Sequence, residues 1–567
     1  MKRIALLALV AMMMLSLVAC GTPAPAPAPE AAPAATEAPV TPAAPAATEA
    51  PAEIAETVLK VQVSVEVASM DPQIARDSTS FEVISAVTEG LFSVDKDGNA
   101  IPAMAEKVDI SEDGLTRTFT LRDAKWSDGT PVTAHDFVFA WRRAADPATA
   151  SEYAFMMETA GIKNAKAVMS GEVPVEELGV RAESDNVLVV ELDRPVAFFD
   201  TLTSFATFMP VNQAFYEKCG AQFATTAETV NCNGPFMLTS YDPAAMTVTA
   251  VKNPNYWDAD AVKLEGIEFQ VIKESQAAAL AFDNGDVHIT SISGEQVQKY
   301  AGTDAFTAVQ QGTLQFVSPN INVAGLENLN LRMAMALAID RDAVCEYILK
   351  DGSIPANYCV PVGLATGPDG KDFRDDPTGE RTYLVSDKEK AVEYYEKAKQ
   401  ELGRDTFEYT MILDDTEEII RIGEFIKAEL EETLPGFSIT IEQMPKKSRI
   451  ARVQDADYDL AMFRWGPDYA DPMTYMDLFM TGGACNYADW KNEEYDKLIE
   501  SCKSGELSVK PAERWEAMKA AEKIAMDEVV VIPIMQKCQV LLTNGDVEGV
   551  EYHVISPDKI FKNVEIN

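Results

Sequence analysis

The feature that most constrains the fold is a regular alternation of strand and helix patterns between residues 407 and 463. Strand patterns at 407–413 and 437–443 flank an amphipathic helix pattern at 417–430, and a third strand pattern follows at 458–463. Strands that alternate with helices in this way pack as a partly parallel sheet covered by helices. The sequence therefore predicts an α/β fold for this part of the chain.

The rest of the folded region mixes sheet and helix patterns. Alternating apolar residues predict strands at 58–65, 116–121, 187–192 and 246–251, with a hairpin at 91–101. Helical periodicity predicts helices at 133–143, 331–349, 388–402 and 512–526. A chain of 567 residues exceeds one small domain, so we expect two or three lobes.

The loop after the strand pattern at 458–463 is the first place to look for a binding site. Ligands of parallel sheets bind beyond the carboxyl ends of the strands. This loop has the sequence Arg464-Trp465-Gly466-Pro467-Asp468-Tyr469. An aspartate between aromatic residues can hold an ammonium group by charge-assisted hydrogen bonds, while the rings supply cation–π surface. The alternative is a structural loop in which Asp468 forms an Asx-turn and Trp465 packs.

The N-terminus has the pattern of a secretory leader. Two basic residues precede an apolar run at 4–18, which is shorter than the ~20 residues that span a bilayer. The following Leu17-Val18-Ala19-Cys20-Gly21 resembles the lipobox of bacterial lipoproteins. That resemblance implies that residues 1–19 are a signal peptide and that Cys20 carries diacylglycerol, whose acyl chains (palmitate, for example) anchor the protein to the cell membrane. The alternative is an ordinary cleavage site with an incidental cysteine.

A segment rich in Pro, Ala, Thr and Glu follows the lipobox. It lacks aromatic residues and most large aliphatic ones, so it cannot bury a core. Frequent proline favours extended polyproline geometry. We expect residues 20–56 to be the lipidated cysteine and a disordered tether.

Charge and motifs count against several functions. With 48 basic and 90 acidic residues, the chain has a net charge of -42 and lacks the basic surface that nucleic acid requires. It has no G-x-S-x-G, H-E-x-x-H or P-loop motif, and its three histidines (His135, His288 and His553) lie far apart in sequence. We therefore expect neither an enzyme nor a cofactor-dependent protein.

The cysteines do not form a metal-binding pattern. They include no C-x-x-C motif and have no histidine at zinc spacing, so no metal site is expected. An oxidising compartment permits disulfides, and the close spacings suggest three pairs, with free thiols as the open alternative. The candidate pairs are Cys219 with Cys232, Cys345 with Cys359, and Cys485 with Cys502, which leaves Cys538 unpaired.

Seven short motifs recur in the order found in one protein family. They are Met70-Asp71-Pro72-Gln73, Glu89-Gly90-Leu91-Phe92, Asp113-Gly114-Leu115-Thr116, the segment 121–132, Asn253-Pro254-Asn255-Tyr256-Trp257, the segment 336–341, and the segment 465–472. Together they resemble the oligopeptide-binding proteins of ABC importers, the extracytoplasmic solute-binding proteins of family 5. The resemblance extends from about Val58 to the C-terminus.

This resemblance implies a periplasmic-binding-protein-like clamshell with mixed sheets, in which one of two lobes carries an extra subdomain. The implied ranges are 57–88, 209–315 and 525–567 for lobe I, 89–208 for the extra subdomain, and 316–524 for lobe II. A peptide would lie extended between the lobes and pair through its main chain, which is common to every peptide sequence.

The resemblance also assigns roles in the loop at 464–469 and opposite it. Asp468 would hold the α-ammonium of the peptide, while Trp465 and Tyr153 would line the cleft beside Tyr469 and Gly466. Two positions depart from the family pattern. Arg76 or Asp77 stands where some relatives have a glutamate, and the arginine that meets the peptide carboxylate in some relatives is displaced to Arg464.

The function implied is that of a lipid-anchored, extracytoplasmic component of an ABC importer. It would act as a monomer, capture peptides (oligopeptides above all) and deliver them to the permease subunits. Binding proteins with the same scaffold take other solutes, so a dipeptide, nickel chelate, haem or oligosaccharide remains an alternative ligand. A secreted hydrolase is the alternative from another class.

Overall fold

The computed structural model describes residues 57–95, 98–379, 381–483, 485–555 and 557–567. The leader, Cys20 and the tether lie outside these residues, so the lipid anchor stays a prediction. The described residues from 57 onward belong to one compact unit.

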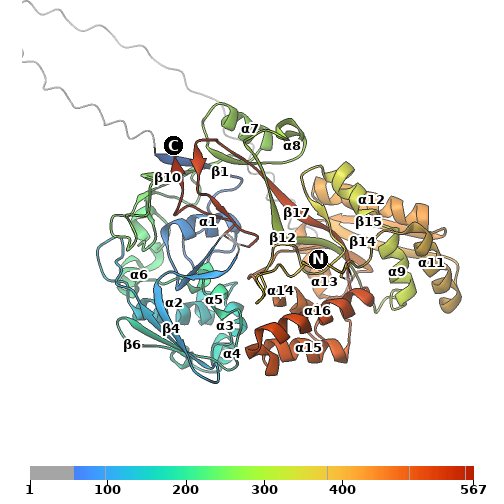
Figure 1. The fold of residues 1–567 in the computed structure, drawn as a ribbon, viewed down its shortest axis with the longest axis horizontal. Coiled ribbons are helices and arrows are strands. Elements are labelled where there is room, and N and C mark those ends of the chain that lie inside the picture. The colour runs from blue at the N-terminus through green and yellow to red at the C-terminus, as the bar shows by residue number, and fades with distance from the viewer. Residues whose placement is uncertain (1–56, 96–97, 380, 484, 556) are drawn as a thin grey trace, which may run out of the picture. The chain divides into compact units, whose positions relative to one another are not determined.

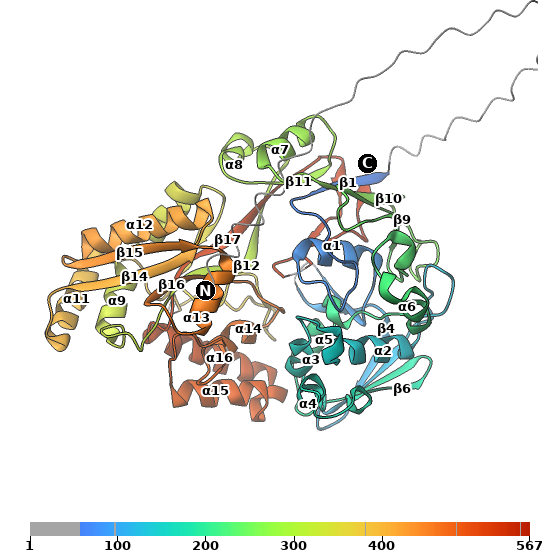
Figure 2. The ribbon, with the colours of Figure 1, turned by 180° about the vertical axis from the view of Figure 1, so that it is seen from behind.

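One large mixed sheet runs through this unit (Figures 1 and 2). In spatial order its strands are β15 (Phe437–Met444), β14 (Phe407–Asp414), β16 (Leu460–Trp465), β12 (Phe306–Pro319), β17 (Ile532–Thr543), β11 (Ile289–Ile292), β1 (Val58–Val63), β10 (Gly266–Val271), β9 (Thr247–Lys252) and β8 (Phe236–Ser240). The short β13 (Ile354–Pro355) pairs with β17. β14 is parallel to β15 and β16, and β1 is parallel to β10 and β11, so the predicted α/β fold with a partly parallel sheet is confirmed.

Helices α12 (Glu417–Thr433) and α13 (Lys446–Gln454) pack on the end of this sheet formed by β14 and β15, and further helices belong to the same part of the chain. They are α9 (Leu329–Ala338), α10 (Arg341–Ala343), α11 (Lys388–Leu402), α14 (Met473–Met476), α15 (Glu493–Lys503) and α16 (Pro511–Asp527). Figure 1 shows α12 and α14 on opposite sides of the sheet, above and below it in that view. Asp387 caps α11 by accepting a hydrogen bond from the Lys390 N–H, so the helix begins where the sequence predicts.

A second sheet forms the core of the predicted extra subdomain. Its strands, in spatial order, are β4 (Ala105–Ile110), β5 (Thr116–Leu121), β7 (Val187–Glu191) and β6 (Val180–Ser184). α2 (Ala134–Ala145) packs on it through buried residues that include Phe137 and Trp141. Thr133 and Asp136 form a capping box at the start of α2, which explains why the helix begins where the sequence predicts.

The remaining elements are short. The helices are α1 (Ser78–Val87), α3 (Phe155–Thr159), α4 (Ala165–Met169), α5 (Phe199–Leu202), α6 (Gln213–Cys219), α7 (Ser275–Asp283) and α8 (Glu295–Tyr300). The strands are β2 (Phe92–Val94) and β3 (Ala100–Pro102), which form the predicted hairpin, and β18 (Val547–Glu548), β19 (Glu551–Tyr552), β20 (Lys559–Ile560) and β21 (Glu565–Ile566).

The long strands β12 and β17 connect the two ends of the large sheet. Their pairing register shifts between Gln310 and Leu314, which marks a bend in β12. Gly312 lies in this bend, and a Cβ there would stand 2.6 Å from Cγ of Pro467 and 3.0 Å from the carbonyl oxygen of Val554. The bend therefore requires a glycine because other chain segments approach its backbone closely. The predicted lobe boundary at 315/316 falls within β12, and the division into lobes remains a prediction.

The prediction of one continuous helix at 331–349 is wrong, because the observed helix is shorter. α9 ends at Ala338, and α10 with one turn of π-helix (Val344–Leu349) follows after a break. Asp340 causes the break, because its carboxylate accepts a hydrogen bond from the Ala343 N–H and starts a new helix. The buried Arg341 then binds four carbonyl groups that a continuous helix could not present together.

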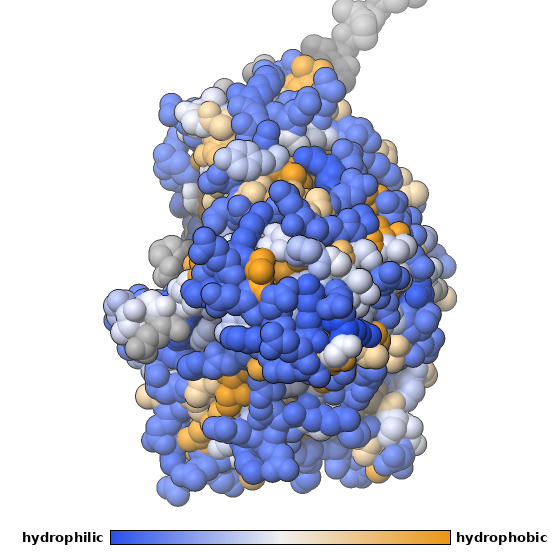
Figure 3. Space-filling model, turned by 90° about the vertical axis from the view of Figure 1, so that its right-hand side faces the viewer, coloured by the Kyte–Doolittle hydropathy of each residue, from blue (hydrophilic) through white to orange (hydrophobic). Residues whose placement is uncertain are grey.

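One face of the unit is mostly polar. Figure 3 shows a face covered largely by hydrophilic residues, with hydrophobic residues scattered between them. Among the described residues, no helix is both long and apolar enough to cross a membrane.

Candidate functional site

Asp468 lies in the loop that joins β16 to α14, beyond the carboxyl end of a strand. Its backbone N–H donates a hydrogen bond to Oγ1 of Thr474 at 3.2 Å. The side chain is half-buried, and burial alone raises the pKa of its carboxyl to about 6. No Lys or Arg of the described chain forms an ion pair with Asp468, so its charge is not compensated within the described residues.

Asp471, not Asp468, has the structural role in this loop. Its carboxylate accepts a hydrogen bond from the Met473 N–H at 2.9 Å and binds the Arg514 guanidinium through two bonds of 2.7 and 2.8 Å. Both side chains are buried, and Arg514 comes from α16. The loop is therefore fixed to α16 without help from the Asp468 carboxylate, which leaves that carboxylate available to a ligand.

The same loop contacts the extra subdomain. The ring of Tyr469 stacks on Phe198 with centroids 4.5 Å apart and planes 6° from parallel. The Arg514 guanidinium lies 5.5 Å from the centre of the Phe198 ring. Tyr469 is buried, so its role is to support the loop of Asp468 through this ring stack.

Tyr475 connects the loop to the bend in β12. Its hydroxyl contacts the carbonyl oxygens of Gly312 and Trp465, the latter at 2.9 Å. Gly466 lies beside the same strand, because a Cβ on it would stand 3.3 Å from Oγ1 of Thr313. The loop that carries Asp468 is thus tied to the bend between the two ends of the sheet.

Tyr153 comes from the extra subdomain and lies within electrostatic reach of Asp468. Burial raises the pKa of Tyr153 to about 12, and the negative charge of Asp468 is the next cause. Tyr153 packs against Phe81, Phe155 and Phe205 with ring centroids 5.0 to 5.7 Å apart. These three phenylalanines are additional candidates for the site, and Phe155 is 43% exposed.

Trp465 lines a cavity of about 20 Å³ between the sheet and the segment at 478–488. Its wall is aromatic and apolar, with Phe316, Phe463, Leu478, Phe479 and Tyr487 among the residues that form it. The Trp465 Nε1 is buried and has no hydrogen-bond partner among the described residues. An unpaired N–H of this kind is costly unless a ligand or water accepts its hydrogen bond.

The two arginines are placed differently from the other predicted site residues. Arg464 alternates with Trp465 along β16 and so points to the opposite face of the sheet, where it pairs with Glu418 of α12 at 3.2 Å. Arg76 is largely exposed and pairs with Glu152. Neither arginine forms an ion pair with Asp468. The roles predicted for them in ligand binding stay predictions.

Comparison with known proteins places this chain in a family. The model of the bacterial extracellular solute-binding proteins, family 5, matches residues 99–486. The chain belongs to this family.

Family 5 relatives share most of the length of the chain. A dipeptide-binding protein of Lactococcus lactis subsp. cremoris is 32% identical over 511 residues, which cover 87% of this chain and 92% of the relative. The oligopeptide-binding protein OppA of Bacillus subtilis is 29% identical over 510 residues, covering 87% and 90%.

Solved structures of family 5 proteins confirm the predicted binding-protein fold. The substrate-binding domain of an oligopeptide ABC transporter from Bacillus anthracis superposes with a TM-score of 0.73 at 37% identity, covering 90% of this chain and 99% of the other. OppA of Listeria monocytogenes, solved with a bound peptide, gives a TM-score of 0.72 at 33% identity with the same coverage.

The suggested disulfides of this family 5 protein are not formed. All seven cysteines from Cys219 to Cys538 are free thiols. The thiols are turned toward other partners, as Cys359 Sγ lies 3.0 Å from Sδ of Met526 and Cys502 Sγ lies 3.6 Å from the Arg514 carbonyl oxygen. Burial raises the pKa of several of these thiols, which disfavours the reactive thiolate.

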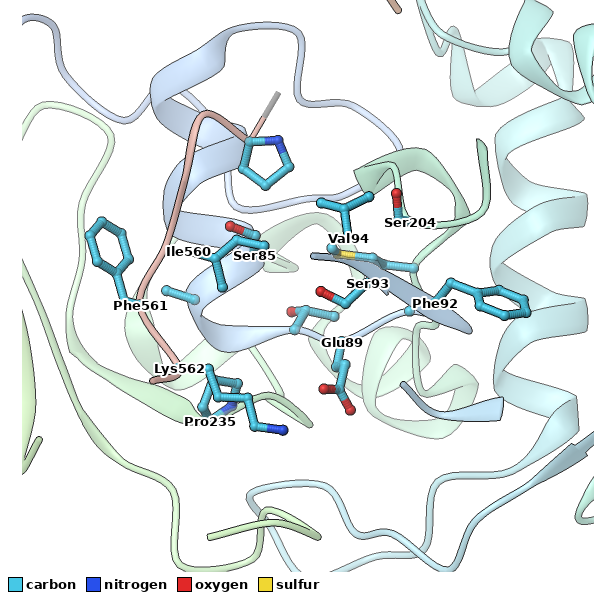
Figure 4. Close-up of a pocket in the computed structure, with 15 residues that line it drawn as sticks. Ser85, Glu89, Phe92, Ser93, Val94, Ser204, Pro235, Ile560, Phe561 and Lys562 are labelled. Carbon is cyan, nitrogen blue, oxygen red and sulfur yellow. The ribbon is translucent and has the colours of Figure 1, made fainter. Parts of the chain in front are cut away.

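A separate cavity of about 50 Å³ lies away from the loop of Asp468, between α1, β2 and the C-terminal segment (Figure 4). Glu89 at its edge accepts hydrogen bonds from the Tyr256 hydroxyl at 2.7 Å and the Trp257 indole at 2.6 Å. Lys562 adds a positive charge nearby. Because Glu89 is satisfied within the protein and the cavity has room for little more than water, we assign it a structural role.

The histidines do not form a common site. His288 accepts a hydrogen bond from the Lys60 N–H, and His135 lies 3.5 Å from Asp185 on the surface. Over the described part of the chain, no group of three or more His, Cys, Asp or Glu residues is arranged to hold a metal ion.

Proposed function

We propose that this family 5 protein captures peptides outside the membrane and delivers them intact to the permease of an ABC importer. The observation that carries the proposal is the uncompensated carboxylate of Asp468, which is half-buried with a pKa raised to about 6. A ligand ammonium supplies the positive charge that this carboxylate lacks. The relatives named as dipeptide- and oligopeptide-binding proteins support a peptide as the source of that ammonium.

The physical basis of affinity is a charge-assisted hydrogen bond in a partly water-free site. A hydrogen bond to a charged group contributes about 1.5–3 kcal/mol net. Main-chain pairing of an extended peptide adds contacts that do not depend on its sequence, so one site accepts many peptides. Tyr153 and Trp465 would form apolar walls on either side of the ligand, and the Trp465 N–H would find an acceptor in it.

Ligand capture would be coupled to movement of the predicted lobes about β12 and β17. The bend at Gly312 adjoins the loop of Asp468 through Pro467 and Tyr475. The stack of Phe198 on Tyr469 joins the extra subdomain to lobe II and would favour the closed form. A peptide that bridges Asp468 and Tyr153 would shift the population toward this form.

The working state would be a monomer anchored through acyl chains on Cys20. The tether at 20–56 would hold the binding unit at a distance from the membrane, where it meets both free peptides and the permease subunits. No catalytic role is proposed.

Native mass spectrometry of the protein as purified tests this function. We expect a co-purified peptide with a free amino terminus, whose mass stays unchanged after long incubation with the protein. A haem, oligosaccharide or nickel chelate in its place would contradict peptide capture. Fragments of an added peptide that accumulate with time would identify a peptidase instead.

A further inference from the structure

A polar cavity lies near the loop of Asp468, and the inference drawn from it rests on the proposed function. The cavity has a volume of about 280 Å³ and is lined from both ends of the large sheet. Its walls include Ser64 and Ser291 at one end, Glu418 of α12 at the other, and Gln311 and Lys537 of the connecting strands β12 and β17. Ser64 is exposed, so the cavity opens to solvent.

Short steps along the backbone connect this cavity to the loop of Asp468. Gln311 precedes Gly312, and a Cβ on Gly312 would stand 2.6 Å from Cγ of Pro467, the residue before Asp468. Gln311 and Lys537 lie on paired strands, which are ~4.8 Å apart. Summed over these steps, the backbones of Asp468 and Lys537 lie within roughly 20 Å of each other. An extended peptide of about four to six residues has this length.

Lys537 lines the cavity, and its ammonium group has no hydrogen-bond partner among the described residues. The one carboxylate within ion-pair distance in this part of the chain is Glu418, at 4.0 Å, which is too far for a hydrogen bond. Burial lowers the pKa of Lys537 and the charge of Arg464 lowers it further, while Glu418 and Asp351 raise it. Because the net shift is downward, these two carboxylates do not compensate for the burial of the ammonium.

The other charges at the cavity are already engaged. Glu418 accepts a hydrogen bond from the Arg464 guanidinium at 3.2 Å, so two cations share its charge. Lys273, the second lysine that lines the cavity, is bound to Glu66 at 2.6 Å. Lys537 is therefore the cation of this cavity whose hydrogen-bond donors are left for a ligand.

We propose that Lys537 binds the C-terminal carboxylate of a peptide whose amino terminus is held by Asp468. The carboxylate supplies both the hydrogen-bond acceptor and the negative charge that the buried ammonium lacks. Every peptide carries this group, so the contact does not depend on sequence. It does depend on length, because only peptides of about four to six residues reach both ends of the site. Arg464, to which the sequence assigns the carboxylate, is bound to Glu418 instead.

Amidation of the peptide C-terminus tests this inference. Calorimetry compares the free acid with the C-terminal amide of tri-, tetra-, penta- and hexa-alanine. We expect the acid to bind about tenfold more tightly than the amide at one or more lengths above three residues, which corresponds to 1.4 kcal/mol. Lys537→Met keeps the aliphatic stem without the charge and should bring this ratio close to one. Glu418→Gln should raise the ratio, because it removes a negative charge that competes with the ligand for Lys537.

Lys273→Met is the matched control, since Lys273 lines the same cavity but is held by Glu66. It should leave the ratio unchanged. Equal binding of acid and amide at every length, or an equal loss in the two lysine variants, would overturn the inference. The amides separate the two levels: if they bind and the free carboxylate adds nothing, only this inference fails. If no peptide binds, the proposed function fails with it.

A second pair of peptides identifies the source of the carboxylate. Amidated peptides that end in Glu or in Gln carry an acidic or a neutral side chain in place of the terminal carboxylate. We expect the gain from Glu to be smaller than the gain from the free C-terminus. A gain from Glu that Lys537→Met abolishes, with none from the free C-terminus, would overturn the assignment, because the carboxylate bound by Lys537 would then come from a side chain.

Discussion

Substitution of Asp468 by Asn gives the sharpest prediction at the site. The change keeps the size of the side chain and removes the charge that would face the peptide ammonium. At pH 7, above its pKa of about 6, the carboxyl is mostly ionised, so the charged form is ready for binding. Loss of a charge-assisted hydrogen bond of about 1.5–3 kcal/mol should weaken peptide binding roughly ten- to a hundredfold.

The same interaction can be removed from the ligand by acetylating the amino terminus of the peptide. Calorimetry on the parent and the Asp468→Asn variant, each with free and acetylated tetra-alanine, gives a double-mutant cycle. Each change alone should cost a similar amount, and the two losses should not add because both remove one contact. Fully additive losses would refute the role of Asp468 as the ammonium ligand, as would an Asn variant that binds like the parent.

Stability measurements exclude unfolding as the cause of a loss. Burial raises the pKa of Asp468 above its ordinary value, so the ionised carboxyl disfavours the folded state at neutral pH. Asp468→Asn should therefore leave the unfolding temperature of the ligand-free protein unchanged or raise it. Asp471→Asn should lower that temperature instead, because it leaves the buried Arg514 without its partner.

Three further outcomes are expected. Peptide affinity should be highest near pH 7 and fall by up to tenfold per pH unit below pH 6, as Asp468 takes up a proton. It should also fall above about pH 8, where the α-ammonium of the free peptide loses its proton. The Asp468→Asn variant is the control, and its affinity should depend on pH below 6 less than that of the parent; an equal response in both would contradict the assignment. Phe198→Ala should remove a ring stack of about 0.5–1.5 kcal/mol and weaken peptide binding by two- to tenfold. X-ray scattering should then show less compaction of the variant on ligand addition. Full compaction and unchanged affinity would show that the stack does not hold the closed form. Cys20→Ala should release the protein from membranes or block its processing, and a variant that fractionates and matures like the parent would disprove the lipid anchor.

Much of the fold could be predicted because local patterns and tertiary structure agree. β5 spans Thr116–Leu121, the predicted range, since its alternating residues face a buried side and an exposed side. The helix at 331–349 could not be predicted correctly, because its apolar pattern continues across Asp340. The break depends on the carbonyl groups that surround the buried Arg341, and these come from distant segments such as Pro533 and Leu384.

Residues of the candidate site could be predicted only where neighbouring residues in the sequence indicate their role. The loop with Asp468 could be found because it follows a strand in an α/β pattern, and the alternation along β16 could also have separated Arg464 from Trp465. The position of Tyr153 followed from the family resemblance alone. Phe198 carries no local pattern that points to Tyr469, because their contact depends on how separate parts of the chain pack.

The central claim, that this protein binds peptides by their free amino terminus and does not alter them, is tested most directly by one titration. Protein freed of co-purified ligand is titrated with tetra-alanine in a calorimeter. The peptide is then recovered, and its mass is measured by mass spectrometry. The account predicts saturable binding of one peptide per protein molecule and recovery of the peptide intact. Absence of binding to this and other peptides with free amino termini, or recovery of fragments, would contradict it.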